Sequence, residues 1–360
     1  MMSTSNFSNK PIYEHLFGSD KTSSNRYLKS TNLFKNKFIF SIFIAFIYIN
    51  ESYAEASIDD LALSFFTPIP KKMPGSETDT QDTIFLGKKL YFETALSINK
   101  TQSCNSCHNI INGGSGVDNL KVSVGALGKF GTRNALTTWN AGFHIAQFWD
   151  GRAKTLEEQA GLPILNANEM AMPSEKILIN RLNGMDYLEH FKKAFPEHIS
   201  PINMDTISVA LAAFQRTLIT SDRFDEYLSG NTNAIDNDEK TGLAVFIERG
   251  CVACHNGPVL GGQLFMKMGL IHPYPNKLDK GMAQVTGNLA DSYIFKVPSL
   301  RNVLNTAPYF HDGAAETIEQ AILDTGWHQL GIKLSKNDVK AIKTFFNTLD
   351  NQTKVNLDDL

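Results

Sequence analysis

Two copies of one short motif, C-x-x-C-H, hold all 4 cysteines of the chain. The copies place two thiols and one imidazole within a few positions, at Cys104, Cys107 and His108 and again at Cys251, Cys254 and His255. This frame is typical of c-type haem attachment, in which the thiols add to the two vinyl groups of the porphyrin and the histidine ligates the iron. The sequence therefore predicts two covalently bound c-type haems.

A C-x-x-C pair has two other common uses, a redox-active disulfide and half of a four-thiolate zinc site. Neither use requires the histidine that follows the second cysteine in both copies. A zinc site would also need the two distant pairs to converge. Haem attachment is therefore the favoured interpretation, and the sixth ligand of each iron then decides the chemistry. A methionine or histidine there gives an electron carrier, whereas an open position lets the iron bind peroxide or oxygen.

Several segments that surround the motifs have the apolar periodicity of amphipathic helices, namely 185–196, 204–220, 239–251 and 335–349. Capping pairs mark three helix starts, at Thr155 with Glu158, at Thr317 with Gln320 and at Ser335 with Asp338. No alternating strand pattern is sustained. The expected fold is mainly α, with long glycine-rich loops at 112–134 and 256–281 that directly follow the two motifs.

The order helix, motif, long loop, helix occurs twice and indicates a weak internal duplication. The length of 360 residues suits two domains. We expect a leader over residues 1–54, an N-terminal domain over 55–220, a C-terminal domain over 221–350 and a tail over 351–360.

The first residues resemble an export signal. Lysines lead into the apolar run Phe38–Ile49, which small residues follow up to Ala56. The run is shorter than the ~20 residues that a membrane-spanning helix needs. Export to the periplasm is the expectation, and an uncleaved N-terminal anchor is the alternative. The formal net charge of -3 gives no signal for binding a polyanion, so no nucleic-acid partner is expected.

The text around the motifs resembles the bacterial di-haem cytochrome c peroxidases, a family that includes the MauG-like enzymes. The resemblance covers about residues 60–350, and it is carried by segments such as LGKKLYFE, GTRNALTTWNAGFHIAQFWDGRA, LITSDRFDEYLSGN and VPSLRNVLNTAPYFHDGA. It implies two cytochrome-c-like helical domains, each with one covalent haem. Peroxide would be reduced at the N-terminal haem, and electrons would enter through the C-terminal haem.

The resemblance also assigns catalytic residues. Trp149 in FWDGR matches a tryptophan between the two haems, whose indole can support electron transfer. Glu169 in NANEM matches the distal glutamate, a carboxylate that can take a proton from peroxide and return it to the leaving oxygen. Gln159 matches a distal glutamine that can hydrogen-bond the ligand.

The same resemblance implies a calcium ion between the domains. Its ligands would be Asn134 and the backbone carbonyls of Thr306 and Pro308. Oxygen-only ligation suits a hard cation. His311 in YFHDG also belongs to the family text, and we expect it near a haem propionate.

One departure from the family concerns the N-terminal haem. Family members that need activation carry a histidine directly after the glycine that matches Gly125, and this histidine caps the resting haem. Here the position is Ala126, and no histidine or methionine occurs between His108 and His144. We therefore expect this haem to be open at rest, without need of reductive activation.

A second departure concerns the C-terminal haem. Thr325 stands where the family has its axial methionine or, in MauG-like enzymes, a tyrosine. His328 lies about one turn further on and is a candidate sixth ligand. Met282 could fold back over the iron instead. Histidine or water would lower the potential of this haem, whereas a thioether would raise it.

These features together predict a periplasmic cytochrome c peroxidase that reduces hydrogen peroxide to water. A small cytochrome c or a cupredoxin would supply the electrons, and the resemblance implies a homodimer. One alternative is a MauG-like oxidase acting on the aromatic side chains of a partner protein. The other is a non-enzymatic di-haem electron carrier or sensor, against which Glu169 argues because a carrier needs no proton shuttle.

Overall fold

A computed structural model describes residues 57–111 and 114–355 of the chain. This part is mainly helical, which confirms the predicted fold class. The predicted leader, residues 1–54, lies outside the described residues. No helix in the described ranges is both long enough and apolar enough to cross a membrane.

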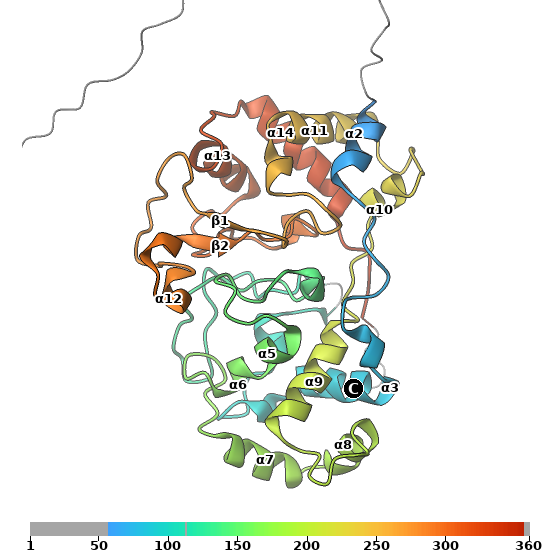
Figure 1. Cartoon of the computed structure of the whole chain (residues 1–360), viewed down its shortest axis with the longest axis vertical. Helices are drawn as coiled ribbons and strands as arrows, with labels where there is room; N and C mark the ends of the chain where they lie inside the picture. Colours follow the sequence, from blue (N-terminus) through green and yellow to red (C-terminus); the bar gives the residue numbers. More distant parts are fainter. Residues whose placement is uncertain (1–56, 112–113, 356–360) are drawn as a thin grey trace, which may run out of the picture. The chain divides into compact units, whose positions relative to one another are not determined.

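The elements form two sets of helices, and a small pair of strands that belongs to the second set lies between them (Figure 1). The α-helices are α2 Ile58–Phe65, α3 Gln81–Phe92, α4 Cys104–Cys107, α5 Leu156–Ala160, α6 Leu162–Leu165, α7 Glu175–Asn183, α8 Leu188–Ala194, α9 Met204–Gln215, α10 Arg223–Leu228, α11 Asn237–Glu248, α12 Ala283–Thr286, α13 Ile318–His328 and α14 Lys336–Phe346. The 3-10 turns are η1 Ser76–Thr78, η2 Thr94–Leu96, η4 Ala141–Phe143, η5 Cys251–Ala253, η6 Leu289–Asp291, η7 Val303–Asn305 and η8 Asn347–Leu349. The strands are β1 Phe265–Lys267 and β2 Ile294–Lys296.

The N-terminal core is the apolar cluster that α3, α7, α8 and α9 bury between them, with Ile110 and Trp139 from the intervening loops. Its central helices α3 and α9 cross at Gly87, where a Cβ atom would lie 1.8 Å from the carbonyl oxygen of Ala210. Only glycine permits backbones to approach this closely. The crossing therefore sets how the helix before the first motif meets the last helix of this cluster.

The C-terminal core is the corresponding cluster of α2, α10, α11, α13 and α14. Its central helices α11 and α14 cross at Gly242, where a Cβ atom would lie 2.1 Å from the carbonyl oxygen of Ala341. The two cores thus repeat one device, a helix before the motif packed at a glycine against a later helix. Helix α2 belongs to this second core, because Ala62 and Phe66 pack against residues that come more than 150 positions later in the chain, such as Phe224.

The structure confirms the three helix starts that were predicted from capping residues. Thr155, Thr317 and Ser335 are the N-caps of α5, α13 and α14, and each side chain accepts a hydrogen bond from a backbone N–H three residues later. Gly250, with φ of 83°, follows the end of α11 just before the second motif. The amphipathic segments 185–196 and 204–220 contain α8 and α9, although both helices end before the predicted ranges do.

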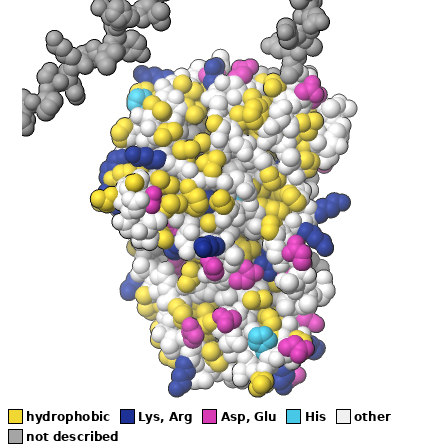
Figure 2. All heavy atoms as spheres, viewed as in Figure 1, with side chains coloured by type: hydrophobic (Ala, Val, Ile, Leu, Met, Phe, Trp, Pro, Cys, Tyr) yellow, Lys and Arg dark blue, Asp and Glu magenta, His cyan; other side chains and the backbone are white. Residues whose placement is uncertain are grey.

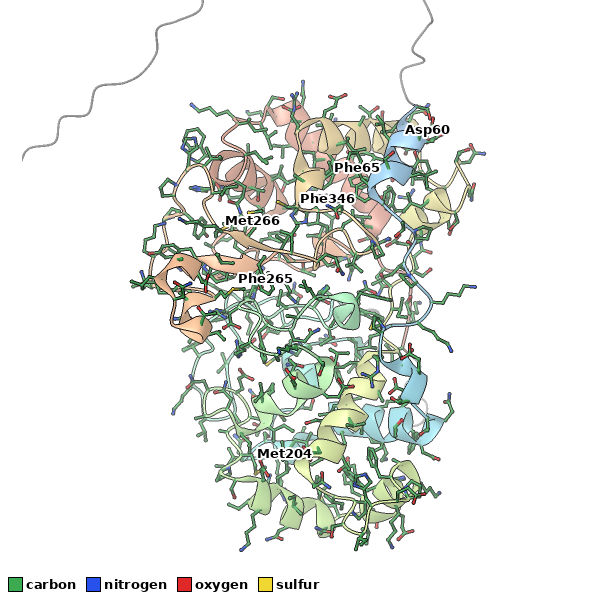
Figure 3. All side chains as sticks on the ribbon, in the orientation of Figure 1. Asp60, Phe65, Met204, Phe265, Met266 and Phe346 are labelled. Atoms are coloured by element: carbon green, nitrogen blue, oxygen red, sulfur yellow. The ribbon has the colours of Figure 1, made fainter. Side chains whose placement is uncertain are left out.

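Strands β1 and β2 form an antiparallel hairpin that the sequence did not predict, because three-residue strands are too short to show an alternating pattern. The register pairs Phe265 with Lys296. The ring of Phe265, labelled in Figure 3, packs so closely over Gly151 that a Cβ atom there would lie 2.4 Å from the ring. The backbone N–H of Lys296 donates to the carbonyl of Trp149 at 2.7 Å. The hairpin therefore connects the C-terminal half to the loop that carries Trp149.

Replacing either crossing glycine should destabilise the protein. Gly87→Ala or Gly242→Ala gains about 1 kcal/mol of helix propensity. The helices must separate to admit the methyl group, and such overpacking costs about 1–3 kcal/mol or more. We expect a net loss in the free energy of unfolding, measured by denaturant titration of the purified protein.

Gly184→Ala is the matched control, because a Cβ atom at this C-cap of α7 would lie 3.4 Å from its nearest neighbour, an ordinary contact. It should change the unfolding free energy by no more than about 0.5 kcal/mol. Unchanged stability in both core variants would show that the close crossings are not needed.

Candidate functional site

The first C-x-x-C-H motif is a single helical turn. Helix α4 begins after Ser103, whose capping box with Ser106 fixes its start, and His108 is the C-cap. Cys104 and Cys107 therefore project from one turn with both thiols free. Burial raises the pKa of the Cys104 thiol to about 12. A thiol so hard to ionise is unlike a redox-active cysteine, whose pKa is depressed.

The second motif repeats this chemistry on the 3-10 turn η5, which holds Cys251, with Cys254 as its C-cap. Both thiols are free, and burial raises the pKa of Cys251 to about 11. Neither cysteine pair of the described chain forms a disulfide.

The two histidines are held in the same way. Nδ1 of His108 lies 3.3 Å from the carbonyl oxygen of Gly116, and Nδ1 of His255 lies 3.0 Å from that of Leu260. A contact with a carbonyl requires a proton on Nδ1, which leaves the lone pair on Nε2 for a metal. Burial lowers the pKa of both imidazoles and so favours the neutral form that ligates metals.

Each motif opens into its own cavity of about 220 Å³. Cys104, Cys107 and His108 line the first cavity, and the second motif lines the second cavity. The four thiols do not converge on one centre. Within the described residues, no group of three or more His, Cys, Asp or Glu side chains is placed to hold a metal ion. The arrangement does not fit a four-thiolate zinc site. Two thiols and one Nε2 on the wall of each cavity do fit a c-type haem.

The predicted distal residues come together in the first cavity, where Glu169 and Gln159 line the same space as His108. Oε1 of Glu169 accepts a hydrogen bond from Nδ2 of Asn166 at 2.8 Å. Burial raises the pKa of the Glu169 carboxyl, and the charge of Arg152 and the Asn166 hydrogen bond offset this only in part. A buried carboxyl with a raised pKa is suited to general acid–base chemistry near neutral pH.

Trp149 lines both cavities and is buried. Its Nε1–H donates to the carbonyl of Asn134 at 2.9 Å, which fixes the indole plane. This placement agrees with the predicted position of Trp149 between two haems.

The loop at Ala126 lies directly against the backbone of Glu169. The N–H of Ala126 donates to the carbonyl of Glu169 at 2.7 Å, and a Cβ on Gly125 would lie 2.1 Å from the carbonyl oxygen of Asn168. Gly125 lines the first cavity and Ala126 does not. The loop thus positions the glutamate and brings no metal-binding side chain to the cavity.

The second cavity has Thr325 on its wall, together with Met266 and Met268 of the hairpin region. His328 and Met282, the two other candidates for a sixth ligand, are not among the residues that line it. Nδ1 of His328 lies 2.9 Å from the carbonyl oxygen of His272. This contact leaves Nε2 of His328 free, as at the motif histidines, but the residue does not line the cavity, so the structure gives no support to its predicted role.

The predicted calcium ligands Asn134, Thr306 and Pro308 all lie on the wall of the second cavity. Nδ2 of Asn134 donates to the carbonyl of Leu120 at 2.9 Å, so its side-chain oxygen stays available to a cation. His311 lines this cavity as well, and its buried Nε2 has no hydrogen-bond partner.

Two residues on the cavity walls were missed by sequence reasoning. Lys296 and His144 line both cavities, and Nζ of Lys296 lies 3.0 Å from Nδ1 of His144. The only sequence signal was a lysine inside the apolar run YIFKVP.

Comparisons with known proteins agree with this geometry. Residues 81–233 match the family model described as di-haem cytochrome c peroxidase. The chain is 44% identical over 276 residues to cytochrome c551 peroxidase of Nitrosomonas europaea, covering 75% of this chain and 80% of the relative. It is 41% identical over 304 residues to cytochrome c551 peroxidase of Pseudomonas aeruginosa, covering 81% and 86%. A crystal structure of a MauG-like protein associated with microbial copper homeostasis superposes with a TM-score of 0.71 at 28% identity, covering 81% of this chain and 95% of the other.

The two motifs should bind cofactor independently. Cys104→Ala with Cys107→Ala should leave one covalent haem, held at the second motif, and Cys251→Ala with Cys254→Ala should leave only the other. The haem-to-protein ratio, from the pyridine haemochrome spectrum and the intact mass, should fall from two to one in each variant. Zinc in place of haem, or loss of both haems from one double variant, would contradict independent sites.

Proposed function

The chain belongs to the di-haem cytochrome c peroxidase family, and we propose that it reduces hydrogen peroxide to water with electrons from a small redox protein. The observation that carries this proposal is the first cavity, where Glu169 and Gln159 share the wall with His108. A carrier of electrons needs no buried carboxylate at this place.

The haem at His108 would supply the iron to which peroxide binds. Side chains of the protein would then carry out the proton transfers. The Glu169 carboxylate accepts a proton from the substrate and returns it to the leaving oxygen, while Asn166 holds its Oε1. The amide of Gln159 offers a donor and an acceptor to the ligand. Arg152 lines the cavity as well, and its charge favours the ionised, proton-accepting form of Glu169.

Electrons would enter through the second cavity and pass the wall that holds Trp149. The outer surface near this cavity suits a docking partner. Lys277 and Lys280 lie 4.5 and 4.8 Å from the ring centre of Tyr293, whose carbonyl accepts from the N–H of Met268. Figure 2 shows lysine and arginine side chains beside hydrophobic ones on the side where α12 lies. An acidic cytochrome c or cupredoxin would complement such a surface.

We infer that the enzyme works without reductive activation. The loop that could cap the first site presents Ala126, whose methyl group cannot ligate iron. At the second site Thr325 lines the cavity where the family has a methionine. Met266 and Met268 are the thioethers on this wall, and if neither ligates the iron the electron-input haem should have a lower potential than in family members with methionine.

Location, calcium and assembly are proposed on the sequence and its family. Export to the periplasm rests on the leader, since bacterial c-type haem is attached outside the cytoplasm. Asn134, Thr306 and Pro308 could hold a calcium ion through oxygen atoms alone. A homodimer is the proposed assembly.

Removing the carboxylate should abolish most activity. Glu169→Gln should lower kcat/KM for peroxide by about 10²–10⁴-fold, because the amide cannot accept the proton. The wild-type rate should fall as the pH drops through the pKa of Glu169, since the base becomes protonated. Burial raises this pKa, so the fall should begin at higher pH than for an exposed glutamate.

The measurement is the oxidation of reduced cytochrome c by peroxide, followed by absorbance at a series of pH values. Glu175→Gln, an exposed change at the start of α7, should leave both rate and pH profile unaltered. A wild-type protein that consumes no peroxide would be an electron carrier. Fast reaction with one equivalent of peroxide, followed by only slow reduction of the oxidised protein by reduced cytochrome c, would instead indicate a MauG-like oxidase.

The absence of a capping ligand can be tested by adding one. The fully oxidised wild type should reach its steady rate at once, with or without prior reduction. Ala126→His should make the initial rate depend on prior reduction, because the new imidazole can cap the iron. Leu127→His is the control, since residue 127 is exposed and should not deliver a ligand. A wild-type lag that prior reduction removes would contradict the proposal.

A further inference from the structure

A buried lysine stands in the wall between the two cavities. Lys296 is 1% exposed and lines both of them. In the described part of the chain, no carboxylate lies within ion-pair distance of its ammonium group, and its one side-chain hydrogen-bond partner is Nδ1 of His144. Burial alone lowers the pKa of Lys296 to about 7. A buried ammonium without an anion is costly, so this site calls for a counterion.

His144 completes the same polar spot. It lines both cavities, and its Nε2 is buried without a hydrogen-bond partner. The ring lies so close to Gly262 that a Cβ atom there would be 2.3 Å from its Cδ2. Gly262 in turn is bound at both backbone groups, its N–H to the carbonyl of Val297 and its carbonyl to the N–H of Ile145. Histidine and lysine are therefore held as a rigid pair.

Other cations near this wall already have partners. Arg133 pairs with Asp150 and Asp279, and Arg152 pairs with Asp150. His311 also has an unpartnered buried nitrogen, but it lines only the second cavity. Among the described cationic side chains, Lys296 combines burial, a lack of anions and access to both cavities.

We propose that Lys296 and His144 form one anion site that binds a haem propionate carboxylate from each cavity, so that a single lysine is the counterion of both haems. This inference rests on the two haems of the proposed function and does not depend on peroxide chemistry. A carboxylate accepts hydrogen bonds from Nζ and from a protonated Nε2, which would neutralise the ammonium charge and give Nε2 the partner that it lacks. The positive charge stabilises the reduced iron at each site, and it links the two potentials through one side chain.

The test measures potentials instead of turnover. Lys296→Met removes the charge and leaves the carboxylates uncompensated, so both midpoint potentials should fall. We expect each one-electron equilibrium to shift about tenfold, which corresponds to about 59 mV. Spectroelectrochemical titration of the purified holoprotein, without peroxide, resolves the two haems. Haem content by pyridine haemochrome is determined first, because fewer than two haems in the wild type would defeat the proposed cofactor content itself.

Two comparison variants make the result specific. Lys296→Arg keeps the charge and should hold both potentials near the wild-type values. Lys267→Met removes an exposed lysine from the partner strand β1 and should change neither. A shift at only one haem, or at neither, in Lys296→Met would overturn the shared counterion.

Lys296→Gln, which is neutral but keeps a hydrogen-bond donor, is measured in parallel, so that loss of haem from Lys296→Met does not end the test. Loss of both haems from both neutral variants, with both haems retained by Lys296→Arg, would also support one shared cation. Loss of one haem alone would contradict it.

Discussion

The site depends on one repeated contact, the one between Nδ1 of a motif histidine and a backbone carbonyl. It joins His108 to Gly116 and His255 to Leu260. The proton on Nδ1 fixes the tautomer, and the carbonyl fixes the ring orientation, so that Nε2 is the nitrogen left to bind iron. The hydroxyl of Tyr91 further donates to the carbonyl of His108 at 2.6 Å. Without these contacts to the histidines, cysteine spacing alone would not define a metal site.

The two halves use the same packing device for the same purpose. A helix that precedes each motif crosses a later helix at a glycine, Gly87 in the first half and Gly242 in the second. Backbone contact at these crossings places the motif turn at the edge of each core, next to a cavity. The halves then differ in what the cavity offers. The first has a carboxylate and an amide, which suit proton transfer, and the second has a threonine and two methionines.

The side chains that could couple the two sites lie in the wall between the cavities. Trp149 provides an aromatic system there, and Lys296 provides a buried charge. The hairpin joins them, because the N–H of Lys296 donates to the carbonyl of Trp149. A shift of β2 would therefore move both the indole and the ammonium group. Family membership explains why two motifs occur, whereas these contacts explain how the two sites can influence each other.

The sequence by itself determined the features that a few neighbouring residues control. The C-x-x-C-H spacing predicted the chemistry of both motifs because one turn brings the thiols and the imidazole together. Capping pairs at Thr155, Thr317 and Ser335 predicted helix starts, since an N-cap bond spans only three residues. The family resemblance supplied Glu169 and Trp149, which the residue types alone would not have distinguished from surface and core positions.

Only the tertiary structure decided which distant residues share a wall. His144 and Lys296 are 152 positions apart, and no local pattern links them. Lys296 lies on a three-residue strand that is too short to leave a periodic signal, and His144 follows the 3-10 turn η4. Helical spacing suggested His328 as a ligand, but it could not show that this residue does not line the second cavity. Contacts between distant segments depend on how whole elements pack, and that packing is not encoded in any one stretch of sequence.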